Sequence, residues 1–162
     1  HFRVAHKNTL APLFLDNLSS YRCFGPHIWS ILPRSTLPEL KQQPVDEWLL
    51  GEHANLLYSV FATSQFLVQE DHFIWIQSSP VAADRTRLKL STMIPKQADT
   101  PEHHDYWNKN HNLTVETLIE DFDLAEGTQR GLVSGANRQL NFGRFEGALA
   151  AFNQSVDQQL AD

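Results

Sequence analysis

From residue 56 onward, the sequence first favours strands and then favours helices. This order limits the possible folds more than any other feature of the chain. Segments rich in β-branched and aromatic residues come first, separated by turn residues, at 56–61, 66–68, 73–77 and 87–93. Beyond Pro95 the sequence favours helices over 105–131 and 144–160, joined by a loop at 135–143. Strands followed by helices are typical of the α+β class. We therefore predict an antiparallel sheet that packs against long C-terminal helices, with a ligand cavity between them.

The segment before residue 56 is less regular. Residues 1–18 predict a helix that breaks near Pro12, and 19–24 and 27–32 are typical of short strands with a Gly-Pro turn between them. Three prolines between residues 33 and 44 then limit the connection to short helical turns. With 162 residues, the chain is expected to form a single domain.

Composition argues against several classes of partner. The net charge is −6 and no cluster of Lys and Arg offsets it, so nucleic acid is a poor match. The longest uncharged run, 54–69, is too short and too polar to span a bilayer. The first residues lack the order of a secretory leader, so we expect a cytoplasmic protein without membrane association. Cys23 is the single cysteine, which excludes an internal disulfide or an all-cysteine metal cluster within this polypeptide.

Two histidines at the start of the chain suggest a metal site. Neutral imidazole is a common ligand of transition metals, and His1 and His6 lie near each other in the first predicted helix. Five residues on a regular α-helix place two side chains about 140° apart, so both rings reach one ion only if the helix is distorted. We predict a π-type distortion between Phe2 and His6. Two surface histidines are the alternative interpretation of the same spacing.

The helix predicted over 105–131 adds carboxylates. Asp121 and Glu126 fall at opposite edges of its apolar face, whereas Glu116, Glu120 and Asp123 point well away from it. A carboxylate at such an edge needs a partner, which is either a cation or else solvent or an arginine. Two His and one Asp together would form a facial triad, the ligand set that leaves positions open on a ferrous ion. The apolar face, which we expect to meet the sheet, consists of Val115, Leu118, Phe122, Ala125, Gln129, Leu132 and Val133.

The segments that carry these residues resemble the catalytic domain of Rieske-type non-haem iron oxygenases, the alpha subunits of ring-hydroxylating dioxygenases and related monooxygenases. HFRVAHKNTL at 1–10 is similar to the two-histidine ligand helix of that family, and EDFDLAEGTQRGL at 120–132 to the helix with its carboxylate ligand. The resemblance implies that His1, His6 and Asp121 are the ligands of Fe(II), and that Glu126 is not one. The tail, GLVSGANRQLNFGRFE at 131–146 and ALAAF at 148–152, is similar to the branch with glycine betaine and choline monooxygenases.

The resemblance also implies a fold and an activity. The fold is a helix-grip of the Bet v1-like or START-like kind, and the activity is O2-dependent hydroxylation of a small organic substrate, aromatic or quaternary ammonium. A reductase or ferredoxin would supply electrons, and the full-length protein would be a homotrimer. The alternative function is a metal-free helix-grip module that binds a hydrophobic ligand.

One feature of the family cannot be formed by this chain. A Rieske [2Fe-2S] cluster needs two cysteines and two histidines, and a single cysteine cannot supply them. We therefore expect a catalytic domain truncated at its N-terminus, with the cluster in a preceding domain that is absent here. We also expect this fragment to be inactive by itself.

Four further residues are predicted around the site. Phe14, Leu118 and Phe122 are candidates for the wall of the substrate pocket, with plain core packing as the alternative for each. Gln129 lies at the centre of an apolar face, where a buried amide must be hydrogen-bonded. We expect it to brace the ligand helix, or else to contact a group near the iron.

Overall fold

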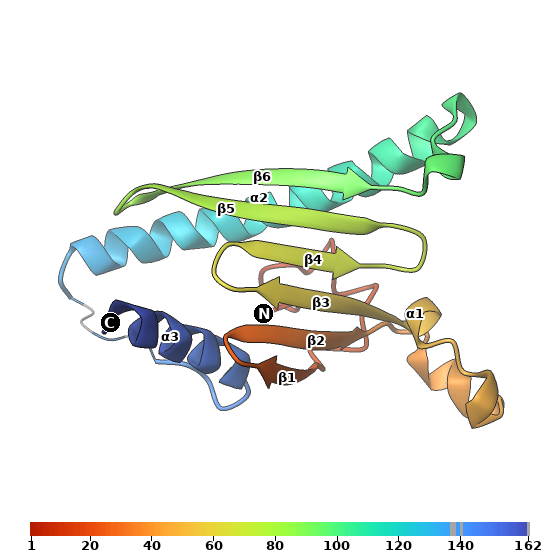
Figure 1. Cartoon of the computed structure of the whole chain (residues 1–162), viewed down its shortest axis with the longest axis horizontal. Helices are drawn as coiled ribbons and strands as arrows, with labels where there is room; N and C mark the ends of the chain where they lie inside the picture. The colour runs from red at the N-terminus through yellow and green to blue at the C-terminus, as the bar shows by residue number, and fades with distance from the viewer. Residues whose placement is uncertain (137–138, 140, 162) are drawn as a thin grey trace.

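A computed structural model describes residues 1–136, 139 and 141–161. Its centre is one antiparallel sheet in which each strand pairs with the next in the sequence (Figure 1). This confirms the predicted meander and, with two helices after it, the α+β helix-grip architecture. The six strands are β1 (Ser20–Phe24), β2 (His27–Pro33), β3 (Ala54–Val60), β4 (Ser64–Val68), β5 (Phe73–Ala82) and β6 (Arg85–Met93).

The sheet differs from the prediction mainly at its longest hairpin. Strands β5 and β6 pair as far as Ala82 and Arg85, so the turn is shorter than the sequence indicates. Pro80 lacks a backbone N–H, yet it is accommodated because the register shifts between Pro80 and Ala82. The connection between β2 and β3 has the predicted short helical turns, which are η1 (Leu37–Gln42), η2 (Val45–Glu47) and α1 (Leu50–His53).

Two long helices follow the sheet. The short turns η3 (Lys96–Ala98) and η4 (Pro101–His103) lead into α2 (His104–Val133), which is about 45 Å long and crosses one face of the sheet (Figure 1). Helix α2 ends where Gly135 adopts a left-handed φ of 70°. The last helix, α3 (Gly147–Leu160), packs beside β1 and β2.

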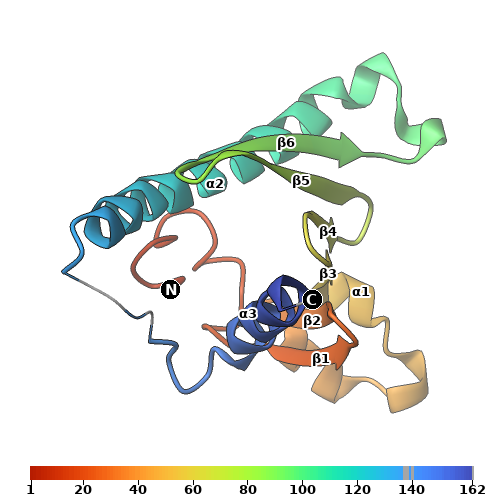
Figure 2. The same ribbon diagram turned by 60° about the vertical axis from the view of Figure 1, so that its left-hand side comes forward.

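The N-terminal segment forms successive turns, so the helix predicted over 1–18 is wrong. The backbone N–H groups of Val4 and Ala5 both donate to the carbonyl of His1, and those of Leu10 and Ala11 both donate to the carbonyl of His6. The bond from Ala11 to His6 has the spacing of a π-helix, and it lies after the region where we predicted it. These turns lie on the same side of the sheet as α2 (Figure 2).

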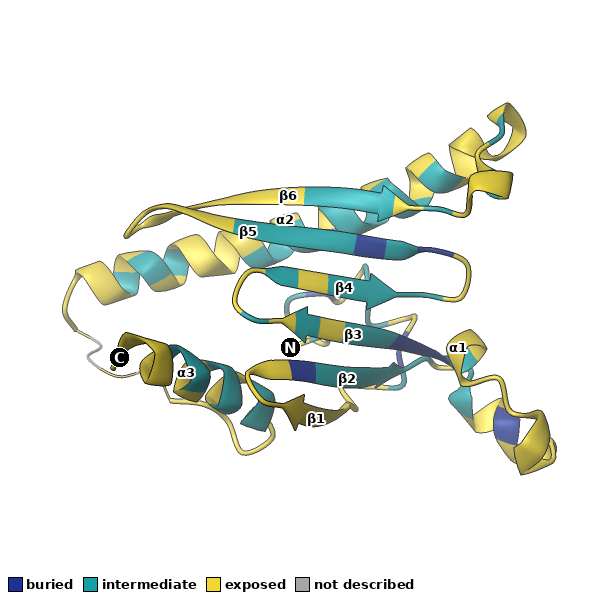
Figure 3. Cartoon of the chain, viewed as in Figure 1, coloured by how far each residue is buried: buried dark blue, intermediate teal, exposed yellow. Residues whose placement is uncertain are grey.

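Alternate residues of the central strands point to opposite faces of the sheet. Leu57, Leu67 and Ile74 are aligned across β3, β4 and β5 on the face toward α2. Phe66 and Trp75 stack on the other face, with ring centres 5.7 Å apart. Burial is concentrated in the sheet and in the segments beneath it, whereas much of α2 and α3 is exposed (Figure 3).

Several polar side chains are buried in the described part of the chain. The buried polar side chains are those of His6, Asn55, His72 and Thr117, and all four line one cavity of about 740 Å³. The cavity lies between the sheet, α2 and the N-terminal turns. Among the described residues, no helix is long and apolar enough to cross a membrane.

Candidate metal centre

Three side chains that are distant in sequence meet at one end of the cavity. His1 and His6 come from the N-terminal turns, and Asp121 comes from the middle of α2. The Nε2 atoms of the two histidines lie 2.9 Å apart. Oδ1 of Asp121 lies 3.1 Å from Nε2 of His6 and 3.5 Å from Nε2 of His1. One donor atom from each residue is therefore directed toward a common point.

These separations suit three neighbouring ligands of one metal ion. Two ligand atoms that bind a metal at about 2.1 Å are about 3.0 Å apart at a right angle and about 3.4 Å apart at a tetrahedral angle. Ligands on opposite sides of the same metal would be about 4.2 Å apart. The three separations, 2.9 to 3.5 Å, lie well below that value, so the donor atoms fit adjacent positions of one ion. A facial triad is one such arrangement, and it leaves the opposite side of the metal open.

Glu120 fixes the orientation of the His6 ring. Its carboxylate lies 2.8 Å from Nδ1 of His6 and accepts a second hydrogen bond from the Thr9 hydroxyl at 2.7 Å. The bonds from His6 and Thr9 hold the pKa of Glu120 below its ordinary value. Because an ionised carboxylate accepts the Nδ1 proton, the neutral ring of His6 has its lone pair on Nε2.

Two groups face that lone pair, since Nε2 of His1 lies 2.9 Å away and Oδ1 of Asp121 lies 3.1 Å away. His6 and Asp121 therefore bring two electron-rich atoms together unless a cation or a proton lies between them. Partial burial raises the pKa of Asp121, the neighbouring Glu120 raises it further, and interactions with His6 offset only part of that rise. His6 is 1% exposed, whereas the Asp121 side chain is only partly buried. The donor set therefore suits a bound divalent cation.

The helical wheel places Glu120 well away from the face that we expected to meet the sheet, and it gives no sign of a second contact. The N-terminal turns cover a second side of α2, and Glu120 is directed into that contact. The position of Glu120 next to Asp121 was the available signal for this contact. Adjacent helical residues lie about 100° apart, so both can contact the same ring from different sides.

The other predicted residues divide into two groups. Phe14 and Leu118 line the cavity, whereas Phe122 is 37% exposed and is not part of its wall. Gln129 is half-buried two turns beyond Asp121, and its bracing role stays a prediction. Glu126 is exposed and lies 4.0 Å from Arg130, in agreement with its exclusion from the ligand set.

The expected apolar face of α2 is only partly covered. Leu118 lines the cavity, but Leu132 and Val133 near the end of the helix are exposed. The apolar pattern beyond residue 121 therefore does not coincide with burial in the described part of this chain. The side of α2 that lines the cavity consists of Tyr106, Asn110, Leu113, Thr114, Thr117, Leu118 and Asp121.

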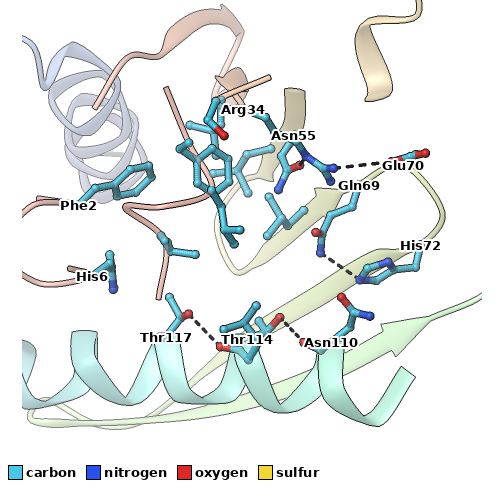
Figure 4. Close-up of a pocket in the computed structure, with 18 of the residues that line it drawn as sticks. Phe2, His6, Arg34, Asn55, Gln69, Glu70, His72, Asn110, Thr114 and Thr117 are labelled. Carbon is cyan, nitrogen blue, oxygen red and sulfur yellow. Dashed lines mark hydrogen bonds and ion pairs between the residues drawn. The ribbon is translucent and has the colours of Figure 1, made fainter. Parts of the chain in front are cut away.

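His72, which is buried like His6, lies at the opposite end of the cavity (Figure 4). Nδ1 of His72 lies 2.6 Å from the carboxylate of Asp71, which also accepts a hydrogen bond from the Tyr106 hydroxyl at 2.6 Å. Nε2 of His72 lies 3.0 Å from the side-chain nitrogen of Gln69. On the adjoining wall, Arg34 donates to the buried Asn55 at 2.9 Å.

Family comparison agrees with this geometry. A family model described as the ring hydroxylating alpha subunit (catalytic domain) matches residues 1–162. Comparisons with curated proteins and with solved structures gave no significant match. The match covers both the turns that carry His1 and His6 and the helix that carries Asp121. The chain therefore belongs to the family of catalytic domains of ring-hydroxylating oxygenase alpha subunits.

Proposed function

We propose that His1, His6 and Asp121 hold a mononuclear Fe(II) ion at which O2 is used to hydroxylate an organic substrate. The observation that carries this proposal is the mutual separation of the three donor atoms, 2.9 to 3.5 Å. When bound, the iron would supply O2 activation, with open positions for O2 beside the substrate.

The residues of the chain have separate tasks in this proposal. Glu120 keeps Nδ1 of His6 protonated and so directs the Nε2 lone pair toward the metal position. Phe2 and Phe14, with ring centres 5.2 Å apart, form an apolar wall next to the histidines. Leu118 lies one turn of α2 before Asp121 and extends that wall. Together these side chains would keep water from the reacting centre and place the apolar part of a substrate against it.

The proposal includes partners that the family implies. Electrons would come from a reductase or ferredoxin through a [2Fe-2S] cluster held outside residues 1–162. We also propose that the full-length protein is a homotrimer, and that it functions in the cytoplasm. Whether one or both oxygen atoms enter the product depends on the substrate, which the cavity rather than the metal ligands would select.

Iron stoichiometry of the full-length protein tests this proposal. We expect about one mononuclear iron per chain in the wild type and a near-complete loss in Asp121→Ala. Asp123→Ala is the matched control, since Asp123 is an exposed carboxylate on the same helix. Its iron content should equal that of the wild type.

Oxygen uptake supplies a second readout. The Asp121→Ala variant should lose substrate-dependent O2 consumption while retaining wild-type secondary structure by circular dichroism. Equal and negligible mononuclear iron in the wild type and in Asp121→Ala would refute the proposal. That result would favour the metal-free module, in which the same cavity carries a hydrophobic ligand.

A further inference from the structure

The cavity continues past the metal end to a place where polar side chains from the sheet and from α2 face one another. Gln69 follows β4, and Asn110 and Thr114 lie one turn apart on α2 (Figure 4). All three line the cavity. None of them belongs to the predicted metal site, so their chemistry has to be explained separately.

Each of these three side chains already donates one hydrogen bond within the protein. Thr114 donates its hydroxyl to the carbonyl of Asn110 at 3.1 Å, and Asn110 donates its side-chain nitrogen to the carbonyl of Tyr106 at 2.9 Å. The Nδ1 proton of His72 points at an ionised Asp71, so its Nε2 accepts a hydrogen bond from the side-chain nitrogen of Gln69.

Three oxygen atoms remain as acceptors. They are Oε1 of Gln69, Oδ1 of Asn110 and Oγ1 of Thr114, and no donor among the described residues bonds to any of them. Acceptors in a half-buried cavity gain most from a partner that brings N–H or O–H groups. A carboxylate at this position would bring further acceptors against these oxygens, and it could pair only with the second N–H of each amide.

Charge around the same end favours a cation. Arg34 lies 3.7 Å from Glu70, and the two charges offset each other. Asp71 accepts hydrogen bonds from both His72 and Tyr106, an environment that suits an ionised carboxylate. Glu52 adds another acidic group to the wall. Apart from Asp121, the cavity wall therefore carries three carboxylates, Glu52, Glu70 and Asp71, and one arginine, Arg34.

Helix α2 sets the distance between the two ends. Thr114 precedes Asp121 by seven residues and Asn110 precedes it by eleven, which corresponds to about 10 Å and 16 Å along the helix axis. The wall between them includes Leu10, Leu67 and Leu118 and is mostly apolar, with the buried Thr117 on α2 as its polar member. A molecule that contacts both ends must therefore be elongated, with an apolar body.

We propose that this cavity takes an elongated substrate with an apolar body and a terminal primary or secondary ammonium group that donates hydrogen bonds to Gln69, Asn110 and Thr114. This inference rests on the proposed function for the identity of the reacting end. A quaternary ammonium carries the same charge but has no N–H, so it cannot satisfy the three acceptors. Recognition by N–H donation therefore separates this proposal from recognition of charge alone.

Matched probes test the proposal by isothermal titration calorimetry on the full-length protein. The probes are 4-phenylbutylamine, its N,N,N-trimethylammonium analogue, 4-phenylbutanol and 4-phenylbutanoate, which share one apolar body. We expect the amine to bind tightest and the carboxylate to bind at least about tenfold more weakly. Equal affinity for the amine and the trimethylammonium probe, tightest binding of the carboxylate, or no binding of any probe would overturn the proposal.

Two threonine variants test whether Oγ1 of Thr114 contributes to amine binding. Thr114→Val preserves the shape and removes the acceptor, so it should weaken amine binding by about three- to tenfold and leave trimethylammonium binding unchanged. Thr128→Val is the matched control, because Thr128 makes the same hydrogen bond to its own helix but is exposed. An equal loss for every probe in Thr114→Val would contradict recognition through Oγ1.

The two proposals fail in different ways. Normal iron loading with a preference for the carboxylate probe would refute the ammonium site and leave the iron site intact. A preference for the amine without iron loading would refute the proposed function and leave the ammonium site as a carrier site. Titrations of the Asp121→Ala variant show the binding preference independently of metal.

Discussion

His6 and His72 are both buried beside a carboxylate, at opposite ends of one cavity, and yet their surroundings suit different roles. Nδ1 of His6 lies 2.8 Å from Glu120, and Nδ1 of His72 lies 2.6 Å from Asp71. The difference is at Nε2. In His6 this atom faces Oδ1 of Asp121 and Nε2 of His1, whereas in His72 it faces the donor nitrogen of Gln69.

The comparison teaches that a buried His–carboxylate pair does not by itself indicate a metal ligand. The carboxylate fixes the tautomer in both cases, and the group that faces the second nitrogen decides the outcome. A donor completes the hydrogen bonding of His72 within the protein. Acceptors around Nε2 of His6 leave a place for a cation, and there the family's iron chemistry is expected.

Removing each imidazole gives the largest expected contrast. His6→Ala should reduce mononuclear iron from about one per chain to near zero, because a ligand is lost. His72→Ala should keep the iron but lower the free energy of unfolding by about 1–3 kcal/mol, since Gln69 and Asp71 lose a buried partner. Metal analysis and urea denaturation of both variants check the contrast. Loss of iron from both would mean that the two ends are not distinct.

The carboxylate beside His6 gives the next largest effect. Glu120→Ala should weaken Fe(II) or Co(II) binding by about 10- to 100-fold, because the His6 ring loses the group that orients it. The absorption bands of bound Co(II) should also shift, which a purely structural loss would not cause. Glu116→Ala, one turn earlier and exposed, should match the wild type. An unchanged Co(II) affinity and spectrum in Glu120→Ala would contradict a positioning role.

At the opposite end, pH should reveal the hydrogen bond between Asp71 and Tyr106. Partial burial acts to raise the pKa of Asp71, but hydrogen bonds from Tyr106 and His72 outweigh it, so this pKa lies below its ordinary value of 3.8. The same bond to Asp71, with burial, raises the pKa of Tyr106 above 10.0. The stabilisation linked to Asp71 is therefore complete above 3.8 and is lost as the pH falls through the lowered pKa.

The sign is opposite for the tyrosine. Its contribution is complete below 10.0 and is lost as the pH rises through the raised pKa. Tyr106→Phe should therefore lower the free energy of unfolding by a nearly constant amount between these two values, about 1 kcal/mol because both groups are partly exposed. Urea denaturation across the pH range tests this. A difference that persists unchanged into strong acid would contradict the assignment.

Sequence patterns predicted the sheet well because its signals are local. The β-branched and aromatic segments between residues 56 and 93 coincide with strands, and the proline-free stretch after Pro101 coincides with α2. The prediction failed for residues 1–18, where turns that are held by packing against α2 and the sheet replace a helix. Local propensity contains no information about such a contact between distant segments.

The site was predictable only in part for the same reason. His1, His6 and Asp121 were proposed from a resemblance, and the fold brings their donor atoms within 4.8 Å of one another. Glu120 was missed because its partner comes from a segment more than a hundred residues away. The polar end of the cavity was missed as well. Gln69, Asn110 and Thr114 come together only because the fold places the end of β4 opposite α2, and the sequence does not show this.

Asp121 and Thr114 lie on the same uninterrupted helix. If Asp121 binds iron and Thr114 binds the substrate, as proposed, the number of helical residues between them sets which carbon of the substrate lies at the metal. Four residues inserted between them would keep both on nearly the same face, within about 40°, and increase their separation by about 6 Å. Under both proposals, such an insertion would move oxidation to a different carbon and leave every proposed ligand in place.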